Sequence, residues 1–313
     1  MPVFCEGAHL PMLLTDVRRS IEQCNLSYEL ILIDDGSPDN SWQVIRAEAQ
    51  ATHTVRGLRL SRNFGKEAAL CAGLQHASGD AVIIIDADGQ HPPSLIPDMV
   101  RLWQKSGADI VEAIKRRRGR ESLSSKFGAQ LFYFILNKLS GFDFKGASDF
   151  KLMNRKAVDA WREMHERNVF FRGMTVWMGF NTVQIPFEVV PRSAGQSAWS
   201  IFKRVKLALI GITAFSSFPL HLVTFAGVVF LGISVLLGVQ TLYLKLVGRA
   251  VSGFATVILL QLIVGSLLMI SLGIIGEYLA RIYEEVKGRP RYLLKESIEL
   301  GKANHNCGDT TEG

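Results

Sequence analysis

The sequence predicts an α/β domain with a mostly parallel sheet, followed by two membrane-spanning helices. Three observations predict this class. Short apolar runs alternate with helical patterns over the first two-thirds of the chain, acidic turns follow two of these runs, and the segment from Phe218 to Ile275 is almost free of charge. Alternating strands and helices favour a parallel sheet covered by helices on both faces, and a long uncharged apolar segment is typical of membrane helices.

The elements of the α/β domain follow one another closely. The pattern predicts strands at residues 29–33, 57–60, 81–85 and 109–113, and helices at residues 41–51, 66–77 and 94–106. Such sheets bind ligands beyond the carboxyl ends of their strands. Two acidic turns, one at Asp34 and Asp35 and one at Asp86 and Asp88, both follow predicted strands. We therefore treat them as parts of one site.

The second acidic turn predicts a metal site. The apolar run 82–85 leads directly to Asp86, Asp88 and Gln90. Two carboxylates one residue apart, with an amide oxygen close behind, can direct hard oxygen ligands at one cation, and Mg²⁺ or Mn²⁺ carrying a diphosphate suits them. A solvated turn is the ordinary explanation of a lone Asp-x-Asp, so the prediction depends on the rest of the chain. His91 is interpreted as a turn residue and not as a ligand.

A nucleotide-sugar site accounts for both acidic turns. Asp34 and Asp35 offer acceptors to a base edge or to ribose hydroxyls, while the second turn holds a metal that bridges the diphosphate and stabilises the departing nucleotide. The alternative for residues 34–39 is a capped turn before a helix, where Asp, Ser and Asn are favoured in any case.

Basic residues follow the strand predicted at residues 109–113, where they could hold an anionic partner such as a phosphate. A phosphate monoester has a second pKa near about 6, so its oxygen is a good nucleophile at neutral pH and the enzyme needs cations more than a strong base. The alternative is a solvated loop or one drawn to anionic lipid. The cations available to such a phosphate are Lys115, Arg116, Arg118, Lys126 and Arg192, and the family resemblance given below adds Ser197 to the residues expected to hold the acceptor phosphate.

Two apolar stretches, 220–246 and 254–275, are each long enough to cross a bilayer as a helix. A short turn joins them, so they predict a hairpin; two buried core helices of a soluble protein are the alternative. Gln261, Ser266 and Ser271 are polar positions in the second stretch. We interpret them as helix–helix or oligomer contacts, because no ionisable residue lies in mid-membrane.

The flanking charges predict the orientation of the hairpin. Lysines and arginines are more numerous before the first stretch and after the second than in the turn between them. By the positive-inside rule, both termini and the α/β domain are then cytoplasmic. The predicted organisation is a cytoplasmic domain over residues 1–197, an amphipathic interfacial helix over 198–216, two transmembrane helices over 217–280 and a cytoplasmic tail over 281–313.

Net charge and the absence of certain motifs limit the classes of partner that we expect for this chain. The net charge of +6 fits either nucleic acid or an anionic membrane surface. The sequence carries no zinc-finger spacing and no aromatic RNA-binding box, so we expect a membrane partner and no nucleic acid. The 4 cysteines have no metal or redox spacing, which is typical of a reducing compartment.

Several motifs occur in an order that resembles a known family. The motifs are Pro2-Val3-Phe4-Cys5-Glu6, Asp34-Asp35-Gly36-Ser37, Leu60-Ser61-Arg62-Asn63-Phe64-Gly65-Lys66, Asp86-Ala87-Asp88-Gly89-Gln90, Ser148-Asp149-Phe150-Lys151 and Arg192-Ser193-Ala194-Gly195-Gln196-Ser197. The chain resembles glycosyltransferase family 2 with the GT-A fold, and within it the polyprenyl-phosphate hexosyltransferases, which include bactoprenol glucosyltransferases and dolichol-phosphate mannose synthases. The resemblance covers nearly the whole chain.

The resemblance implies a metal-dependent, inverting transfer of a hexose from a nucleotide sugar to undecaprenyl or another polyprenyl phosphate. The product would be a lipid-linked sugar that modifies surface polysaccharide such as O-antigen. UDP-glucose is the favoured donor, and GDP-mannose and an aminoarabinose donor are the alternatives. A processive polysaccharide synthase and an inactive membrane scaffold are the competing classes.

The resemblance also implies the roles of individual residues. Asp88 and Asp149 are the expected catalytic residues, with Asp149 orienting a sugar hydroxyl or the acceptor. The residues expected to bind the nucleotide sugar are Pro2, Phe4, Glu6, Asp34, Asp35, Lys66 and Asp86, and those expected to hold Mg²⁺ or Mn²⁺ are Asp86, Asp88 and Gln90.

The chain departs from the family pattern in three places. Cys5 stands where the family usually has Asn, and Ala198 follows Ser197 where Lys is common. The sequence begins at Met1-Pro2-Val3, so we expect the first strand to be shortened, with the native start upstream or the chain truncated.

Overall fold

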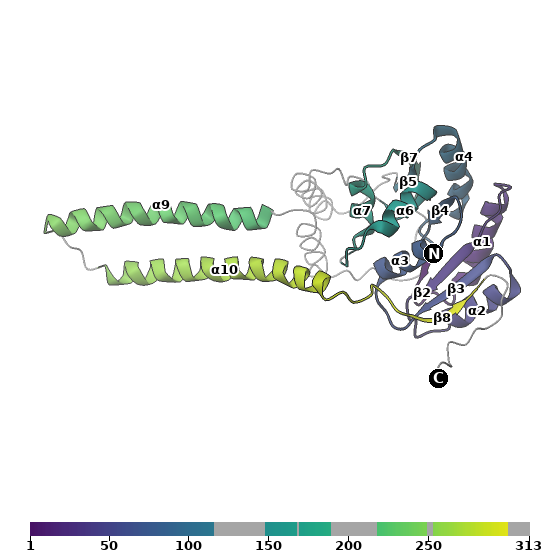
Figure 1. Ribbon diagram of the computed structural model, residues 1–313, viewed down its shortest axis with the longest axis horizontal. Coiled ribbons are helices and arrows are strands. Elements are labelled where there is room, and N and C mark those ends of the chain that lie inside the picture. Colours follow the sequence, from purple (N-terminus) through teal and green to yellow (C-terminus); the bar gives the residue numbers. More distant parts are fainter. Residues whose placement is uncertain (116–147, 168, 189–217, 249–252, 300–313) are drawn as a thin grey trace, which may run out of the picture. The chain divides into compact units, whose positions relative to one another are not determined.

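The computed structural model describes residues 1–115, 148–167, 169–188, 218–248 and 253–299. These residues fall into two compact units. The first, called here the α/β unit, contains all the described strands and the shorter helices. The second contains two long helices, α9 (Phe218–Leu246) and α10 (Phe254–Val286) (Figure 1).

The first sheet of the α/β unit has the strand order β1-β2-β3-β8. Its strands are β1 (Pro2–Val3), β2 (Leu30–Asp34), β3 (Val55–Leu60) and β8 (Leu294–Ile298). The first three run parallel, with Leu30 opposite Val55, whereas β8 runs antiparallel to β3. Every residue of β2 is buried, as expected for a strand covered on both faces.

The second sheet has the order β4-β6-β5-β7. Its strands are β4 (Ala81–Ile84), β5 (Ile110–Lys115), β6 (Lys151–Asn154) and β7 (Thr182–Phe187). Strand β6 runs antiparallel to β4 and to β5, and β7 runs parallel to β5. The expectation of one mostly parallel sheet is therefore wrong: the described strands form two mixed sheets. Antiparallel neighbours need no helical crossover, and neither β6 nor β8 was predicted.

Three helices of the α/β unit lie where the sequence pattern predicted helices. The described helices of this unit are α1 (Leu10–Glu22), α2 (Ser41–Ala51), α3 (Lys66–His76), α4 (Ile96–Ser106) after a short 3₁₀ turn η1 (Pro93–Leu95), α6 (Arg155–Glu163) and α7 (Phe171–Trp177). The four predicted strands and three predicted helices are all present, with ends within two residues of those expected. The hydrophobic spacing thus located these elements correctly.

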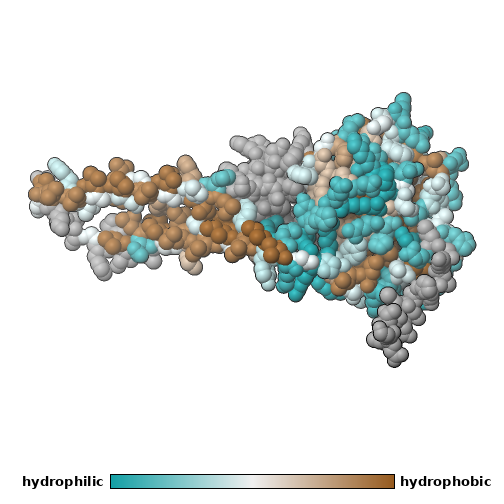
Figure 2. Space-filling view, viewed as in Figure 1, coloured by the Kyte–Doolittle hydropathy of each residue, from teal (hydrophilic) through white to brown (hydrophobic). Residues whose placement is uncertain are grey.

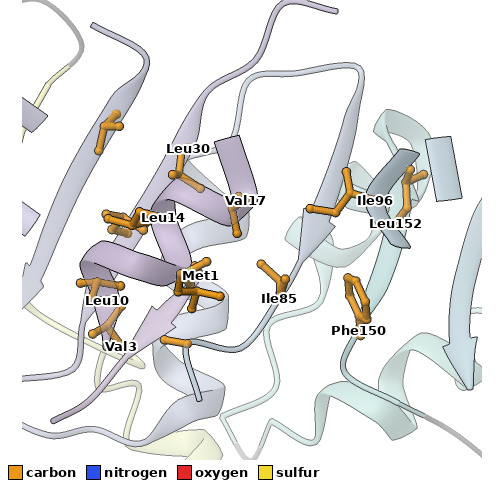
Figure 3. Close-up of a cluster of buried hydrophobic side chains, with 14 of the residues drawn as sticks. Met1, Val3, Leu10, Leu14, Val17, Leu30, Ile85, Ile96, Phe150 and Leu152 are labelled. Atoms are coloured by element: carbon orange, nitrogen blue, oxygen red, sulfur yellow. The ribbon is translucent and has the colours of Figure 1, made fainter. Parts of the chain in front are cut away.

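Alternate residues of β2 pack into different clusters. Leu30 and Leu32 belong to a core that includes side chains of α1 and α2, whereas Ile31 and Ile33 pack with α3. Figure 3 shows the first cluster, in which Leu30 lies beside α1. Each such side chain contributes about 1.5–3 kcal/mol when fully buried. This two-sided burial holds the carboxyl end of β2, where an acidic turn begins, in one position.

The same core anchors the residues beside two aspartates. Ile85 and Phe150 are buried members of the cluster in Figure 3. Ile85 immediately precedes Asp86, and Phe150 immediately follows Asp149. Packing of these apolar neighbours therefore fixes the backbone from which both carboxylates project.

A charged pair is buried inside the second sheet. Lys151 Nζ lies 3.0 Å from Glu112 Oε1 and donates a hydrogen bond of 2.6 Å to Thr175 Oγ1. Both charged side chains are almost inaccessible, at 2% and 6% exposure. Burial lowers the pKa of Lys151, and the neighbouring carboxylate of Glu112 opposes that shift. Each charge depends on the other, because removal of either would leave an uncompensated charge in the interior.

Strand β8 covers the outer edge of β3. The Trp42 indole on α2 donates a 3.0 Å hydrogen bond to Glu296 Oε2, and Arg59 Nη1 of β3 lies 3.2 Å from Glu296 Oε1. Ile298 packs against the core at the other end of β8. A segment that follows α10 in the sequence is therefore an integral part of the α/β unit.

A cavity of about 420 Å³ is lined by β2, β4, α1 and α4. Met1 is one of its lining residues, and the Met1 α-amino group donates a 2.8 Å hydrogen bond to Ile31 O. Burial lowers the pKa of this amino group to about 5, with a smaller opposing effect of Asp86. Strand β1 is short, as expected from the sequence, and pairs with β2 at Ile33 and Asp34.

The second unit is an antiparallel pair of apolar helices. Helices α9 and α10 contact each other, and their segments Leu220–Leu244 and Ile263–Val286 have mean hydropathies of 2.5 and 1.9. Neither window is buried inside the protein, and Figure 2 shows apolar residues along both helices. Helices that expose apolar residues all round are typical of membrane spans. Helix α10 continues well past the predicted limit at Ile275, and the amphipathic helix predicted over 198–216 lies outside the described residues.

Candidate active site

Two acidic turns follow β2 and β4, as the sequence predicted. Asp34 is the last residue of β2. Strand β4 ends at Ile84, and Asp86 follows it with only Ile85 between them. Helix α3 begins at Lys66, after the loop that follows β3. Charged residues therefore lie at the end of β2 and in the segments that follow β3 and β4.

The Lys66 ammonium joins two carboxylates that are far apart in the sequence. Its Nζ lies 2.7 Å from Asp86 Oδ2 and 2.6 Å from Asp149 Oδ2. Burial alone would lower the pKa of Lys66, but the two carboxylates outweigh it and raise that pKa. The raised pKa keeps the ammonium charged. The side chain is 39% exposed, so it can also reach solvent. The structure thus brings together three residues that the sequence placed in the site.

Asp149 has a second cationic partner. Arg172 on α7 grips it with two hydrogen bonds, Nε to Oδ1 at 2.7 Å and Nη2 to Oδ2 at 2.8 Å. Burial favours the neutral acid, but the hydrogen bonds and charges of Arg172 and Lys66 hold the pKa of Asp149 well below its usual range. An ionised carboxylate with so low a pKa is a poor proton acceptor. Asp149 is therefore suited to orient a partner, not to serve as a general base.

Glu67 lies beside this group, and its pKa is shifted in the opposite direction from that of Asp149. Burial raises its pKa to about 7, and the negative charge of Asp149 adds to the shift. Its Oε2 accepts a 3.0 Å hydrogen bond from the backbone N–H of Phe171. Glu67 thus ties the start of α3 to the start of α7, next to Arg172.

The turn after β4 fits a divalent cation. Asp86 Oδ1 is buried and has no hydrogen-bond partner among the described residues, although Oδ2 contacts Lys66. Asp88 Oδ1 accepts a 3.0 Å hydrogen bond from Gln90 N, and Gly89 between them has φ = 70°, which glycine adopts without strain. Among the described residues no three His, Cys, Asp or Glu side chains form a metal cluster. Two carboxylates and an amide would leave coordination positions for diphosphate oxygens, as is usual for Mg²⁺.

His91 accepts a hydrogen bond from the backbone of Asp86 and so helps to fix its position. Its side chain is buried, its Nδ1 accepts a 3.2 Å hydrogen bond from Asp86 N, and its ring stacks on Phe150 with centroids 4.9 Å apart. This arrangement is consistent with the expected turn residue. It also links the backbone of Asp86 to the residue that follows Asp149.

The first acidic turn is held by its own hydrogen bonds. Asp34 is fully buried, with Oδ1 accepting from Ser37 N at 3.0 Å and Oδ2 lying 3.2 Å from Arg59 Nε. The oxygens of Asp35 accept from the backbone N–H groups of Phe64 and Gly65 at 2.8 and 2.9 Å. Burial raises the pKa of Asp35, while these two hydrogen bonds oppose the rise. Both aspartates therefore shape the loops after β2 and β3.

Gly36 is required where these loops meet. It has φ = 66°, and a Cβ at this position would lie 2.5 Å from the carbonyl carbon of Arg62 and 2.7 Å from Asn63 N. Both contacts are with backbone and cannot be relieved by rotating a side chain. The close approach places the loop before α3 against the first acidic turn.

The loop after β1 lies against the first acidic turn as well. Cys5 N donates to Ser37 Oγ at 3.1 Å and Glu6 N donates to Ser41 Oγ at 3.0 Å. Phe4 is 46% exposed while Pro2 is buried. Of the predicted donor-binding residues in this segment, Phe4 therefore offers an accessible apolar surface.

The predicted acceptor-phosphate residues fall mostly outside the described part of the chain. Lys115 is the last residue of β5. The others, Arg116, Arg118, Lys126, Arg192 and Ser197, lie outside the described residues. Their role stays a prediction from the sequence.

Sequence reasoning missed three residues of this group. Arg172 and Glu67 were not singled out, and His91 was assigned only to a turn. A lone arginine beside aromatic residues carries no motif, and its partner Asp149 is 23 residues away. The one available signal was the need of a buried carboxylate such as Asp149 for a cation.

Comparison with known proteins decides the family. Residues 1–161 match the family model described as glycosyl transferase family 2. The chain belongs to glycosyl transferase family 2. It is accordingly a transferase, and the predicted GT-A class of its α/β unit is confirmed.

Relatives in this family match almost end to end. The SfII prophage-derived bactoprenol glucosyl transferase of Shigella flexneri is 40% identical over 299 residues, which cover 95% of this chain and 96% of that protein. A prophage bactoprenol glucosyl transferase homolog of Escherichia coli K12 is 37% identical, with coverages of 94% and 97%. The uncharacterized glycosyltransferase YkcC of Bacillus subtilis is 35% identical, with coverages of 96% and 93%. The predicted resemblance to bactoprenol glucosyltransferases is thereby confirmed.

The solved structures to which this chain is similar are more distant in sequence. Mannosyltransferase PcManGT from Pyrobaculum calidifontis, in complex with GDP-Man and Mn²⁺, has a TM-score of 0.46 at 18% identity and covers 68% of this chain and 61% of that one. Glucosyl-3-phosphoglycerate synthase from Mycobacterium tuberculosis, in complex with Mn²⁺ and UDP-glucose, has a TM-score of 0.46 at 17% identity, with coverages of 68% and 74%.

Proposed function

We propose that this family 2 transferase moves glucose from UDP-glucose to undecaprenyl phosphate and releases a lipid-linked glucose. The observation that carries the proposal is the 40% identity, over 95% of the chain, to a protein named bactoprenol glucosyl transferase. The charged group of Lys66, Asp86 and Asp149 supports it, because transfer from a nucleotide diphosphate requires positioned charges. GDP-mannose and an aminoarabinose donor are the alternatives.

Asp86, Asp88 and Gln90 would hold the divalent cation. Mg²⁺ or Mn²⁺ bound there would neutralise charge on the diphosphate and on the departing nucleotide. Asp86 Oδ1 is buried and has no hydrogen-bond partner in the part of the chain that the structure describes, which supports this assignment, because a buried carboxylate oxygen without a partner is costly.

The donor nucleotide is assigned to the loops after β1 and β2. Phe4 would pack against the base, and Glu6 and Asp35 would lie around the ribose, with Pro2 and Asp34 shaping the loops that hold them. The hydrogen bonds from the loop after β1 to Ser37 and to Ser41 at the start of α2 support a single site. Lys66 would face the diphosphate.

The acceptor phosphate needs cations and no strong base. A phosphate dianion attacking the anomeric carbon opposite the departing nucleotide would invert its configuration, so an α-linked donor would give a β-linked product. Lys115, Arg116, Arg118, Lys126, Arg192 and Ser197 are the proposed acceptor-phosphate residues. Asp149, kept ionised by Arg172 and Lys66, would orient a sugar hydroxyl while remaining unprotonated.

The membrane supplies the acceptor. We assign α9 and α10 as transmembrane helices of a bacterial inner-membrane protein, with the α/β unit and both termini in the cytoplasm. Their unburied apolar surfaces support this, and the basic residues flanking them set the orientation. Homo-oligomerisation would use the polar positions Gln261 and Ser266.

A donor panel tests the proposal. Purified protein is incubated with undecaprenyl phosphate, Mg²⁺ or Mn²⁺, and UDP-glucose, GDP-mannose or an aminoarabinose nucleotide, and lipid products are identified by mass spectrometry. We expect one glucosyl group on the lipid phosphate. A long polymer would indicate a processive synthase, and no lipid product with any donor would indicate an inactive scaffold.

Asp88→Ala tests the catalytic assignment in the same assay. Loss of a carboxylate that acts on the metal and the departing nucleotide should lower the rate by at least about 10²-fold. The matched control is Asp98→Ala, which removes an exposed aspartate of α4 paired only with Arg101 among the contacts described. Retained activity in Asp88→Ala would show that the metal role is misplaced.

A further inference from the structure

Lys66 lies where a divalent cation bound to Asp86 would feel its charge. Its ammonium is 2.7 Å from Asp86 Oδ2, and Oδ1 of the same carboxylate is the buried oxygen that has no hydrogen-bond partner in the described part of the chain. A metal at Oδ1 and an ammonium at Oδ2 would be like charges separated by one carboxylate, which is unfavourable in a partly buried site. Binding of the metal therefore favours departure of Lys66.

The surroundings of Lys66 allow it to leave. Each of its two carboxylates has another source of positive charge: Asp149 keeps its paired hydrogen bonds to Arg172, and Asp86 would gain the metal. Neither becomes an unpaired buried charge, so the usual penalty for breaking a buried ion pair is avoided. Lys66 is also the first residue of α3 and is 39% exposed, so its side chain can move without disturbing a helix interior.

Lys66 needs a new partner once it leaves. It stands at the N-terminus of α3, where the helix dipole disfavours a positive charge and favours an anion. A nucleoside diphosphate bound at the metal would supply that anion. The diphosphate would interact favourably with both cations and so remove the repulsion between them.

We propose that Lys66 is an internal counter-cation that occupies Asp86 until a nucleoside diphosphate arrives, which makes the divalent cation and the donor bind cooperatively. The inference rests on the proposed function, since it uses the same metal site. Cooperativity of this kind is reciprocal: the diphosphate raises metal affinity by the same factor by which the metal raises diphosphate affinity. Neither the metal nor the diphosphate alone would then keep Lys66 displaced from Asp86.

Mn²⁺ binding to the purified full-length protein tests this without turnover. Free Mn²⁺ is measured by electron paramagnetic resonance, with and without UDP, and binding that persists in Asp88→Ala is subtracted. We expect wild-type protein to bind Mn²⁺ weakly alone and Lys66→Met to bind it about tenfold more tightly. The enhancement by UDP should shrink correspondingly in Lys66→Met and be retained in Lys66→Arg.

Two further variants sharpen the test. Lys66→Gln keeps hydrogen-bond donation without charge and should behave as Lys66→Met, which provides a second measurement if the methionine variant does not fold. Lys105→Met, on the last turn of α4, should bind Mn²⁺ as the wild type does. Unchanged or weaker Mn²⁺ binding in the two neutral Lys66 variants would overturn the counter-cation role alone. Absence of Mn²⁺ binding to the wild type, with and without UDP, would overturn the metal site of the proposed function as well.

Discussion

At the scale of single residues, charge pairing decides which groups can lie inside the α/β unit. Asp149 is buried and remains ionised because Arg172 and Lys66 both contact it. Glu67 lies close by, and burial raises its pKa to about 7, a rise that the charges of Lys66 and Arg172 oppose only in part. Two neighbouring buried carboxyl groups thus differ in pKa because Asp149 makes direct ion pairs with both cations, whereas burial dominates at Glu67. Each difference predicts a measurable effect.

Lys151 tests the buried pair of the second sheet. Lys151→Met would leave Glu112 as an uncompensated buried charge, so we expect the free energy of unfolding to fall by about 3–5 kcal/mol. Thermal unfolding of the purified protein would measure this. The double variant Lys151→Met/Glu112→Gln should recover much of the loss, because the Gln amide can still accept the hydrogen bond from Ser148 N. Equal destabilisation in the single and double variants would contradict the pairing argument.

Glu67 predicts a pH dependence of stability. Its pKa is about 7 in the folded protein against 4.5 in the unfolded chain, so between these values the folded protein holds a proton that the unfolded chain has lost. Its contribution to stability is fully present below pH 4.5 and is lost as the pH rises through about 7.

Glu67→Gln mimics the protonated form and should remove this dependence. Relative to Glu67→Gln, we expect the wild type to lose on the order of 1–3 kcal/mol between these two pH values. Chemical unfolding at a series of pH values measures it. Parallel pH profiles of the two proteins would show that Glu67 does not titrate in this range.

The sequence predicted the carboxylates of the site but not their cations. Asp86 was identified from its place after a predicted strand, and Asp149 from a motif that carries the family resemblance. Arg172 was missed because its role depends on α7 packing beside β6, a contact that no local pattern encodes. The side-chain contacts of Asp35 were missed for a similar reason, since its partners Phe64 and Gly65 are backbone groups of another loop.

At the scale of elements, local patterns and long-range pairing behave differently. Helix α2 begins and ends where its hydrophobic spacing predicted, at Ser41 and Ala51. Strand β8 was missed, because its sequence Leu-Lys-Glu-Ser-Ile has only two apolar residues and its partner β3 lies more than 200 residues earlier. Pairing at such a distance is set by the whole fold and not by local propensity.

Strand β8 predicts that the end of the chain stabilises the α/β unit. Truncation after Gly288 would remove β8, expose the edge of β3 and leave the Trp42 indole without Glu296. We expect a loss on the order of 3 kcal/mol or more, together with aggregation through the open edge. Thermal unfolding and light scattering would measure both effects.

The matched control for this truncation is one that ends after Glu299. It retains β8 and its contacts with Trp42 and Arg59, so it should unfold as the full-length protein does. Similar behaviour of the two truncated proteins would mean that β8 contributes little.

At the scale of the whole molecule, one chain combines a unit with a buried apolar core and a pair of helices with exposed apolar surfaces. The α/β unit buries its apolar residues in its own core, whereas α9 and α10 leave theirs unburied. The sequence predicted this division well, because a long uncharged stretch is a strong signal that needs no tertiary information. It did not predict that the chain returns after α10 to complete the first sheet.

The unburied helices predict a definite topology. Arginines and lysines are concentrated before α9 and after α10, with Lys287, Arg289 and Arg291 among the latter, and the positive-inside rule keeps such ends in the cytoplasm. We expect an epitope inserted after Gly248 to be accessible to antibody in intact spheroplasts. Epitopes at either terminus should become accessible only after the membrane is permeabilised. Accessible termini in intact cells would place the α/β unit outside the cytoplasm, away from nucleotide sugars, and would contradict the proposed donor.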